Sequence, residues 1–163
     1  MGKRLYTIGY EGCDIDEFVE ALSRSQIRFL ADVRKNPVSR KPGFSKSRLA
    51  AKLAAAGIEY LHLPELGVPT QWRKDAKAEL ITRDRMFKDY RRQILPKAGE
   101  QIRLLKSLVS KSNAKSRIAL LCYEADACDC HRADVAKKVA KREDIYDLDI
   151  SKLTSRARSG RSS

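Results

Sequence analysis

The sequence contains no long hydrophobic run. A helix that crosses a membrane needs about 20 predominantly apolar residues, and no stretch approaching that length occurs in the 163 residues of the chain. The opening segment MGKRLYTIGY has two basic residues but no apolar stretch of the length found in signal peptides. We therefore expect a protein that is neither secreted nor bound to a membrane, and the cytoplasm is its expected location.

Cysteine and histidine are scarce. Four cysteines in a chain of this size do not resemble a disulfide scaffold, and they suit a reducing compartment. Three of them lie close to one of the two histidines, at Cys122, Cys128, Cys130 and His131. Zinc prefers these ligand types, but a one-residue gap and an adjacent Cys-His pair depart from the usual spacing of roughly two to four residues. We predict no bound metal, with a metal-dependent or redox cysteine site as an alternative.

Glycine-rich phosphate-binding loops are also missing. The turn GYEGC at residues 9–13 lacks the third glycine of a dinucleotide fingerprint, and we predict no nicotinamide or other cofactor. The loop YEADACD at residues 123–129 is acidic, whereas a cysteine-dependent phosphatase needs a loop rich in glycine and backbone donors at that point. The sequence therefore argues against that class of phosphatase.

Basic residues, in contrast, are abundant. The chain has 34 Lys and Arg against 21 Asp and Glu, a formal net charge of +13, and residues 66–117 alone hold 14 basic and 5 acidic residues. Clustered cations gain free energy by releasing the counterions of phosphate groups. This favours a polyanionic partner, nucleic acid first and an anionic surface second, with a merely soluble basic surface as the alternative. In this span Trp72, Arg73, Arg91 and Arg92 are candidate nucleic-acid-binding residues, because they combine an aromatic ring with cations.

Patterns typical of strands and helices alternate along the chain. Strands are predicted at residues 4–8, 27–33, 58–63, 117–122 and 145–150, and helices at 14–24, 45–57, 79–95, 97–109 and 131–141, with a loop at 67–76. Asp14 and Ser45 are the expected N-caps of the first two helices. Strands joined through helices form parallel sheets, so we predict an α/β fold. It is a single Rossmann-like domain over residues 1–150, with a mostly parallel sheet of about five strands, helices on both faces and a basic, disordered tail at 151–163.

The candidate site residues follow the predicted strands. In an open parallel sheet, ligands bind beyond the carboxyl ends of the strands, where the strand order reverses, and we place this reversal between the first and fourth strands. The residues at this edge are Tyr10 and Glu11 after the first strand, Asp32, Arg34 and Arg40 after the second, Glu65 after the third, and Glu124, Cys130, His131 and Arg132 after the fourth.

Three catalytic roles can be assigned among these residues. Glu124 and His131 are the candidate general acid and base, and Cys130 is a candidate nucleophile. The seven residues predicted to bind an anion or substrate are Tyr10, Glu11, Asp32, Arg34, Arg40, Glu65 and Arg132. Arg132, near a helix start, is the expected two-pronged clamp for a phosphate or carboxylate, and a structural ion pair with an aspartate is the alternative.

Four segments carry a family resemblance. They are TIGYEG at 7–12, ADVRKNPVSR at 31–40, GIEYLHLPELG at 57–67 and CYEADACDCHR at 122–132. In this order they resemble the domain of unknown function 488 family, which includes the YeaO-like bacterial proteins. The resemblance implies an α/β, Rossmann-like fold with family-typical residues at Asp32, Arg34, Pro37, Arg40, Glu65, Cys122, Glu124, Cys130, His131 and Arg132. It implies no activity, because a fold alone does not supply one.

Two functions from different classes fit these observations. The first is an enzyme that acts on a phosphate-bearing substrate, a nucleotide or nucleic acid, in a cleft at the carboxyl edge of the sheet. The alternative is a nucleic-acid-binding module without catalysis that uses the basic span 66–117. Loss of a carboxylate at Glu124 separates the two, because it would abolish catalysis and leave nucleic-acid affinity nearly intact.

Overall fold

The sheet of this protein is entirely parallel. The computed structural model describes residues 4–124 and 130–153. Its five strands are β1 Leu5–Gly9, β2 Ile27–Asp32, β3 Glu59–His62, β4 Arg117–Cys122 and β5 Ile145–Leu148, in the order β3-β2-β4-β1-β5. Every strand pair is parallel. The predicted α/β, Rossmann-like fold with five strands is confirmed.

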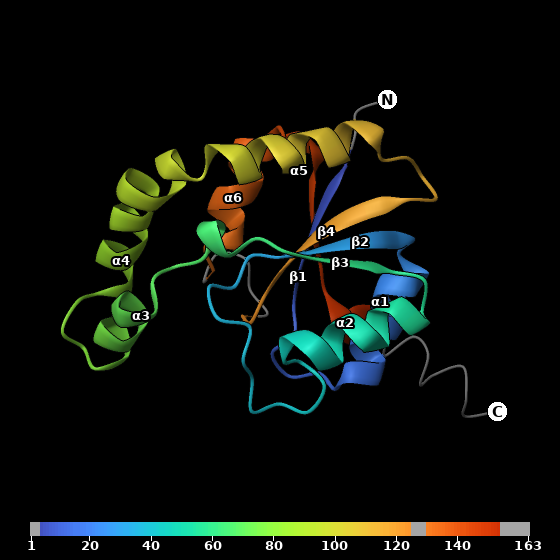
Figure 1. Cartoon of the computed structure of the whole chain (residues 1–163), viewed down its shortest axis with the longest axis horizontal. Helices are drawn as coiled ribbons and strands as arrows, with labels where there is room; N and C mark the ends of the chain where they lie inside the picture. The colour runs from blue at the N-terminus through green and yellow to red at the C-terminus, as the bar shows by residue number, and fades with distance from the viewer. Residues whose placement is uncertain (1–3, 125–129, 154–163) are drawn as a thin grey trace.

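Helices cover both faces of the sheet. Helices α1 (Ile15–Arg24) and α2 (Lys46–Ala55) lie on one face, and α5 (Gly99–Lys111) and α6 (Arg132–Val139) lie on the other (Figure 1). Helix α1 begins where the sequence predicts, because the Asp14 carboxylate accepts a hydrogen bond from the Glu17 N–H at 2.8 Å. Ser45 is the N-cap residue of α2, as predicted, but its hydroxyl bonds to the backbone of Ser39 and not to an N–H of α2.

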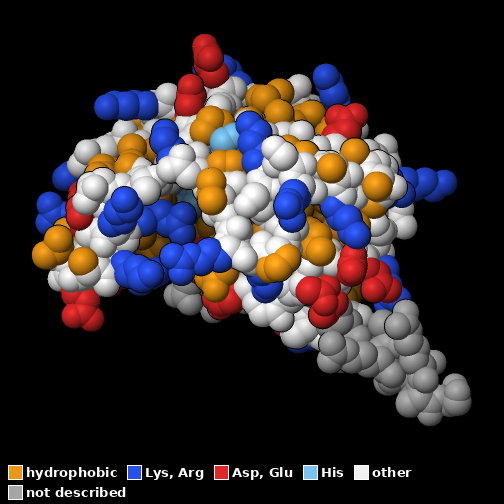
Figure 2. Space-filling view, turned by 60° about the horizontal axis from the view of Figure 1, so that its bottom comes forward, with side chains coloured by type: hydrophobic (Ala, Val, Ile, Leu, Met, Phe, Trp, Pro, Cys, Tyr) orange, Lys and Arg blue, Asp and Glu red, His pale blue; other side chains and the backbone are white. Residues whose placement is uncertain are grey.

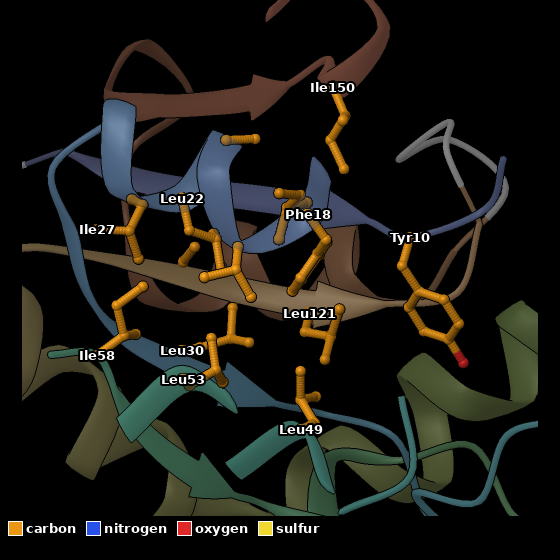
Figure 3. Close-up of a cluster of buried hydrophobic side chains, with 14 of the residues drawn as sticks. Tyr10, Phe18, Leu22, Ile27, Leu30, Leu49, Leu53, Ile58, Leu121 and Ile150 are labelled. Carbon is orange, nitrogen blue, oxygen red and sulfur yellow. The ribbon is translucent and has the colours of Figure 1, made fainter. Parts of the chain in front are cut away.

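Each face of the sheet has its own apolar cluster. Phe18 and Leu22 of α1 pack with Leu49 and Leu53 of α2 against Leu121 and its neighbours in the sheet (Figure 3). On the other face, α5 and α6 contribute side chains that pack against alternate residues of the same strands, such as Ile118 and Leu120 of β4. Strand β4 is therefore buried on both sides, which explains its uninterrupted apolar sequence.

The long connection between β3 and α5 differs from the prediction. Residues 67–76 are not a loop, because α3 spans Thr70–Lys77. The single helix predicted at 79–95 is also wrong: α4 spans Arg83–Asp89 and continues as a π-helical turn, Tyr90–Ile94. Glu79 has a φ of 60°, a left-handed conformation that interrupts a helix, and the break leaves Leu80 74% exposed.

The ordered chain continues past the predicted domain boundary. Residues 150–153 are helical, and Leu153 packs against the first apolar cluster. Residues 151–153 of the predicted tail are thus part of a helical turn, and the rest of that tail lies outside the described residues. Among the described helices, none is both long enough and apolar enough to cross a membrane.

Candidate functional site

The strand order places the site beside β2 and β4. As predicted, β1 and β4 are neighbours. The reversal, however, lies one strand away: β2 leads through α2 to β3 at one edge, while its neighbour β4 leads through α6 to β5 at the other edge. The two connections diverge beyond the carboxyl ends of β2 and β4, and this is where a crevice forms in an open parallel sheet.

A pocket of about 570 Å³ occupies this position. It lies between the ends of β2 and β4 and the helices α3 and α4, which stand to one side of the sheet in Figure 1. In the space-filling view, Lys and Arg side chains gather around a hollow on the surface (Figure 2). The pocket is large enough for a small-molecule ligand, since such sites occupy roughly 300 to 1,000 Å³.

One wall of the pocket is basic. Arg73, Lys74 and Lys77 come from α3, and Arg83 begins α4. Within the described part of the chain, the three α3 cations form no ion pair with a carboxylate. Among the lining residues that the structure describes, Glu124 is the single carboxylate, and its Oε1 lies 3.8 Å from an Arg83 nitrogen. Four cations and one carboxylate in this described lining make the pocket attractive to anions.

Two sulfur atoms and an imidazole form the floor of the pocket. Cys122 at the end of β4 and Cys130 before α6 are joined by a disulfide. The Nδ1 atom of His131 lies 3.7 Å from the Cys122 sulfur and 3.6 Å from the Cys130 sulfur. Oε2 of Glu124 lies 3.2 Å from the Cys122 sulfur. The disulfide thus has the His131 ring nitrogen close to both of its sulfurs and the Glu124 carboxylate close to the Cys122 sulfur.

The backbone fixes the orientation of the His131 ring. Its Nε2 lies 2.8 Å from the carbonyl oxygen of Val33, and because a carbonyl can only accept, Nε2 carries the proton and donates it. Nδ1 therefore faces the sulfurs with a free lone pair. Burial lowers the pKa of His131 to about 4 despite the opposing hydrogen bond to Val33, and the positive charges of Arg73 and Arg132 add to the lowering. The imidazole is neutral at neutral pH.

Arg34 forms a buried ion pair with Asp32 and does not line the pocket. Its guanidinium donates to both carboxylate oxygens of Asp32 at 2.8 and 2.7 Å, to the carbonyl oxygen of Phe44 at 2.9 Å, and to the Tyr10 hydroxyl at 3.2 Å. Burial lowers the pKa of Arg34, but the hydrogen bonds and charge of Asp32 outweigh it and raise the pKa overall. Tyr60 also donates its hydroxyl proton to Asp32. These contacts connect β2 to the segment before α2.

Arg132 is fully buried at the start of α6. It donates a hydrogen bond from Nη1 to the backbone carbonyl oxygen of Glu124 and does not line the pocket. This contact fixes the backbone of Glu124, whose side chain lines the pocket. Because Arg132 does not line the pocket, it makes no contact there with a phosphate in this structure, and it supports the backbone of Glu124 instead.

The other predicted site residues are dispersed. Tyr10 is buried, while Glu11, Arg40 and Glu65 are exposed, and none of the four lines the pocket. Trp72 is half-buried against the second apolar cluster. The Arg91 and Arg92 side chains pair with Asp134 and Asp89 on the surface. The structure thus brings together Glu124, Cys130, His131 and Arg73.

Sequence reasoning missed three of the four pocket cations. Lys74 lies in the predicted loop, Arg83 lies in the predicted helix at 79–95, and Lys77 falls between these two segments. A signal was present: the stretch TQWRKDAK after Pro69 contains no glycine or proline and several good helix formers. In such a helix, residues 73, 74 and 77 share a face, so the cationic wall follows once α3 is recognised.

A comparison with protein-family models gave a match. The family described as "Domain of unknown function DUF488" matches residues 14–139. No curated protein and no solved structure matched the chain. The matched region includes the basic wall, both bridged cysteines and His131.

Proposed function

The chain belongs to the DUF488 family, and we propose that this member is an enzyme that acts on a phosphate-bearing substrate in the pocket between β2, β4, α3 and α4. The observation that carries the proposal is that the basic wall and the floor of the pocket lie next to each other. Four cations form one wall, and the floor holds a carboxylate, an imidazole and two cysteine sulfurs. A phosphate on the basic wall would direct the rest of a substrate toward this floor.

The shape of the pocket supports a substrate with an apolar part beside its phosphate. Val68, Met86 and Phe87 add apolar surface to the lining. Val38 and Tyr123 also line it, although they are 82% and 42% exposed. Exposed apolar side chains at a polar pocket mark ligand-binding surfaces. A nucleotide, with a flat ring and a phosphate, has this combination.

Glu124 is the group best placed to move a proton. Its side chain is 20% exposed, so substrate and water can reach it. It lies between the cation of Arg83 and the cysteine sulfurs. A carboxylate at this point would accept a proton from a water or a substrate hydroxyl and return it to a leaving group. His131 is buried and its Nδ1 faces the cysteine sulfurs, so we assign the proton transfer to Glu124 alone.

Phosphate binding is tested first with a pair of matched variants. We expect inorganic phosphate and a panel of nucleotides to raise the melting temperature of the wild-type chain. The double variant Lys74→Gln/Lys77→Gln should bind roughly tenfold more weakly, because each lost cation contributes up to about 1 kcal/mol. Lys88→Gln/Lys97→Gln removes the same charge from exposed positions outside the pocket and should bind like the wild type.

The enzyme proposal would be replaced by the nucleic-acid-binding module if the two double variants lost equal affinity, or if only oligonucleotides stabilised the protein and did so in a salt-dependent manner.

Catalysis is tested with Glu124→Gln, which keeps the size of the side chain but cannot take up a proton. For any phosphate compound that the wild type converts, turnover should fall by at least about a hundredfold, with little change in binding.

A further inference from the structure

The floor of the pocket also has the composition of a metal site. Cys122 and Cys130 offer sulfur atoms and His131 offers Nδ1, and these three atoms lie within 4.8 Å of one another. We propose that the protein with reduced cysteines binds one Zn²⁺ ion through Cys122, Cys130 and His131. This set, two thiolates and an imidazole, is one that zinc takes in sites with an open fourth position.

The distances fit a tetrahedral ion. With Zn–S near 2.3 Å and Zn–N near 2.0 Å, two ligand atoms of sulfur and nitrogen are about 3.6 Å apart in a tetrahedral site. The observed separations from Nδ1 to the two sulfurs are 3.7 and 3.6 Å. Only the sulfurs need to separate, to about 3.8 Å, when the bond between them is broken.

The tautomer of His131 supports the same conclusion. A histidine that binds zinc generally donates its other ring N–H to a carbonyl or carboxylate, which orients the ring and leaves the ligating nitrogen unprotonated. Here Nε2 donates to the carbonyl oxygen of Val33 at the end of β2, and Nδ1 points at both sulfurs. The rigid sheet edge thus presents a histidine that is already oriented as a ligand.

The fourth position would face the pocket. All three proposed ligands line it, and Glu124 lies beside Cys122. An ion there would be open to water or to a phosphate oxygen, within reach of a carboxylate. Its role in the reaction rests on the proposed function, whereas the binding of the ion does not.

Metal binding and the disulfide exclude each other. A phosphine reductant and one water convert the disulfide to two thiols and a phosphine oxide, which balances the two electrons and two protons. The thiols then lose their protons as Zn²⁺ binds. One molecule of hydrogen peroxide takes up two electrons from the two thiolates and two protons from solvent and becomes two waters, which reforms the S–S bond and releases the ion. The chain therefore has two states at this floor, metal-bound when reduced and disulfide-bonded when oxidised.

The test is a titration of the full chain with Zn²⁺ against a chromophoric chelator, without phosphate. After anaerobic reduction and removal of the phosphine, we expect uptake of one equivalent of zinc; the oxidised protein should take up none. Cys122→Ser and Cys130→Ser should each lose stoichiometric binding. Cys13→Ser is the matched control, because Cys13 is a buried free cysteine outside the pocket, and it should retain one equivalent.

A spectroscopic measurement avoids dependence on the folding of variants. Co²⁺ added to the reduced wild type should give the intense visible bands of a tetrahedral ion and a sulfur-to-cobalt charge-transfer band, and Zn²⁺ should abolish both. The proposal is overturned if reduced wild type takes up no zinc, if oxidised protein takes up as much, or if Co²⁺ gives only the weak spectrum of an octahedral ion. Phosphate binding can succeed or fail independently of these results.

Discussion

Arg34 and Asp32 show how a charged pair can be built into the interior of this protein. The Arg34 side chain is 4% exposed and that of Asp32 is not exposed at all. Every hydrogen bond that Arg34 makes helps to offset the cost of removing its charge from water. Tyr60, Tyr10 and the carbonyl of Phe44 complete the network, so the pair connects β2, β3 and the segment before α2.

Removal of this guanidinium should strongly destabilise the fold. In Arg34→Ala the carboxylate of Asp32 stays buried without its cation, and we expect the free energy of unfolding to fall by about 3 to 5 kcal/mol. Arg24→Ala breaks the exposed pair between Arg24 and Glu20, where about 1 kcal/mol or less is expected. Urea denaturation of both variants measures the difference. Equal effects would contradict the structural role given to Arg34.

The pairing of Arg34 with Asp32 could have been predicted from the sequence, but the disulfide could not. Residues two apart on an extended chain project to the same side, so Asp32 and Arg34 could have been paired from their spacing. Cys122 and Cys130 are separated by eight positions, and nothing in the sequence fixes the path of the chain between them. The distance between their sulfurs depends on how α6 packs against the sheet, which is a tertiary property.

At the scale of elements, local patterns predicted the sheet and its covering helices. The inner strands β1, β2 and β4 are mostly buried and apolar, and Asp14 marks the start of α1 by its carboxylate. The prediction failed between β3 and α5, where Gly67 and Pro69 indicated a loop. Pro69 instead immediately precedes α3, where its missing N–H costs nothing. The pocket needs this helix, so an error in one element concealed most of the basic wall.

Gly67 has a structural role that its own conformation does not reveal. Its φ of −81° is accessible to any residue. An added Cβ, however, would lie 2.4 Å from the backbone nitrogen of Lys35, which is too close for any real contact. The turn before α3 therefore touches the backbone that follows β2, and only glycine permits this approach. The contact fixes α3 relative to the end of β2.

Gly67→Ala should disturb both stability and ligand binding. The clash is with backbone and cannot be relieved by a side-chain rotation, so we expect a loss of about 1 to 3 kcal/mol. Phosphate binding should weaken as well, because the turn leads directly into the basic wall.

Gly99→Ala is the matched control. Its added Cβ meets only an Arg103 nitrogen at 3.6 Å, which is an ordinary contact, so stability and phosphate binding should both stay near wild type. Thermal denaturation and phosphate titration test the pair, and two unaltered variants would contradict the close approach.

At the scale of the whole molecule, two apolar clusters sandwich one sheet and the chemistry lies at its edge. The basic wall lies outside both clusters, and the half-buried Trp72 and Ala76 pack its helix α3 against the second cluster. Strand order positions the pocket, and the connection from β3 to α5 supplies its cations. The fold and the edge that carries the site could be predicted from alternating strands and helices. The pocket itself required the three-dimensional placement of α3 and α4.

The disulfide should stabilise the molecule without being required for its fold. It closes a segment of eight residues, for which loss of chain entropy in the unfolded state predicts about 2.5 kcal/mol. Both apolar clusters lie largely outside that segment, so the reduced chain should still unfold in one cooperative transition, at a lower urea concentration. The measurement is urea denaturation with and without a phosphine reductant, in a buffer with a chelator that prevents metal binding.

The control is Cys122→Ala/Cys130→Ala, which should resemble the reduced wild type and show no response to the reductant. An unchanged midpoint on reduction would show that the bond adds no stability, and loss of the transition would show that the sheet cannot form without it.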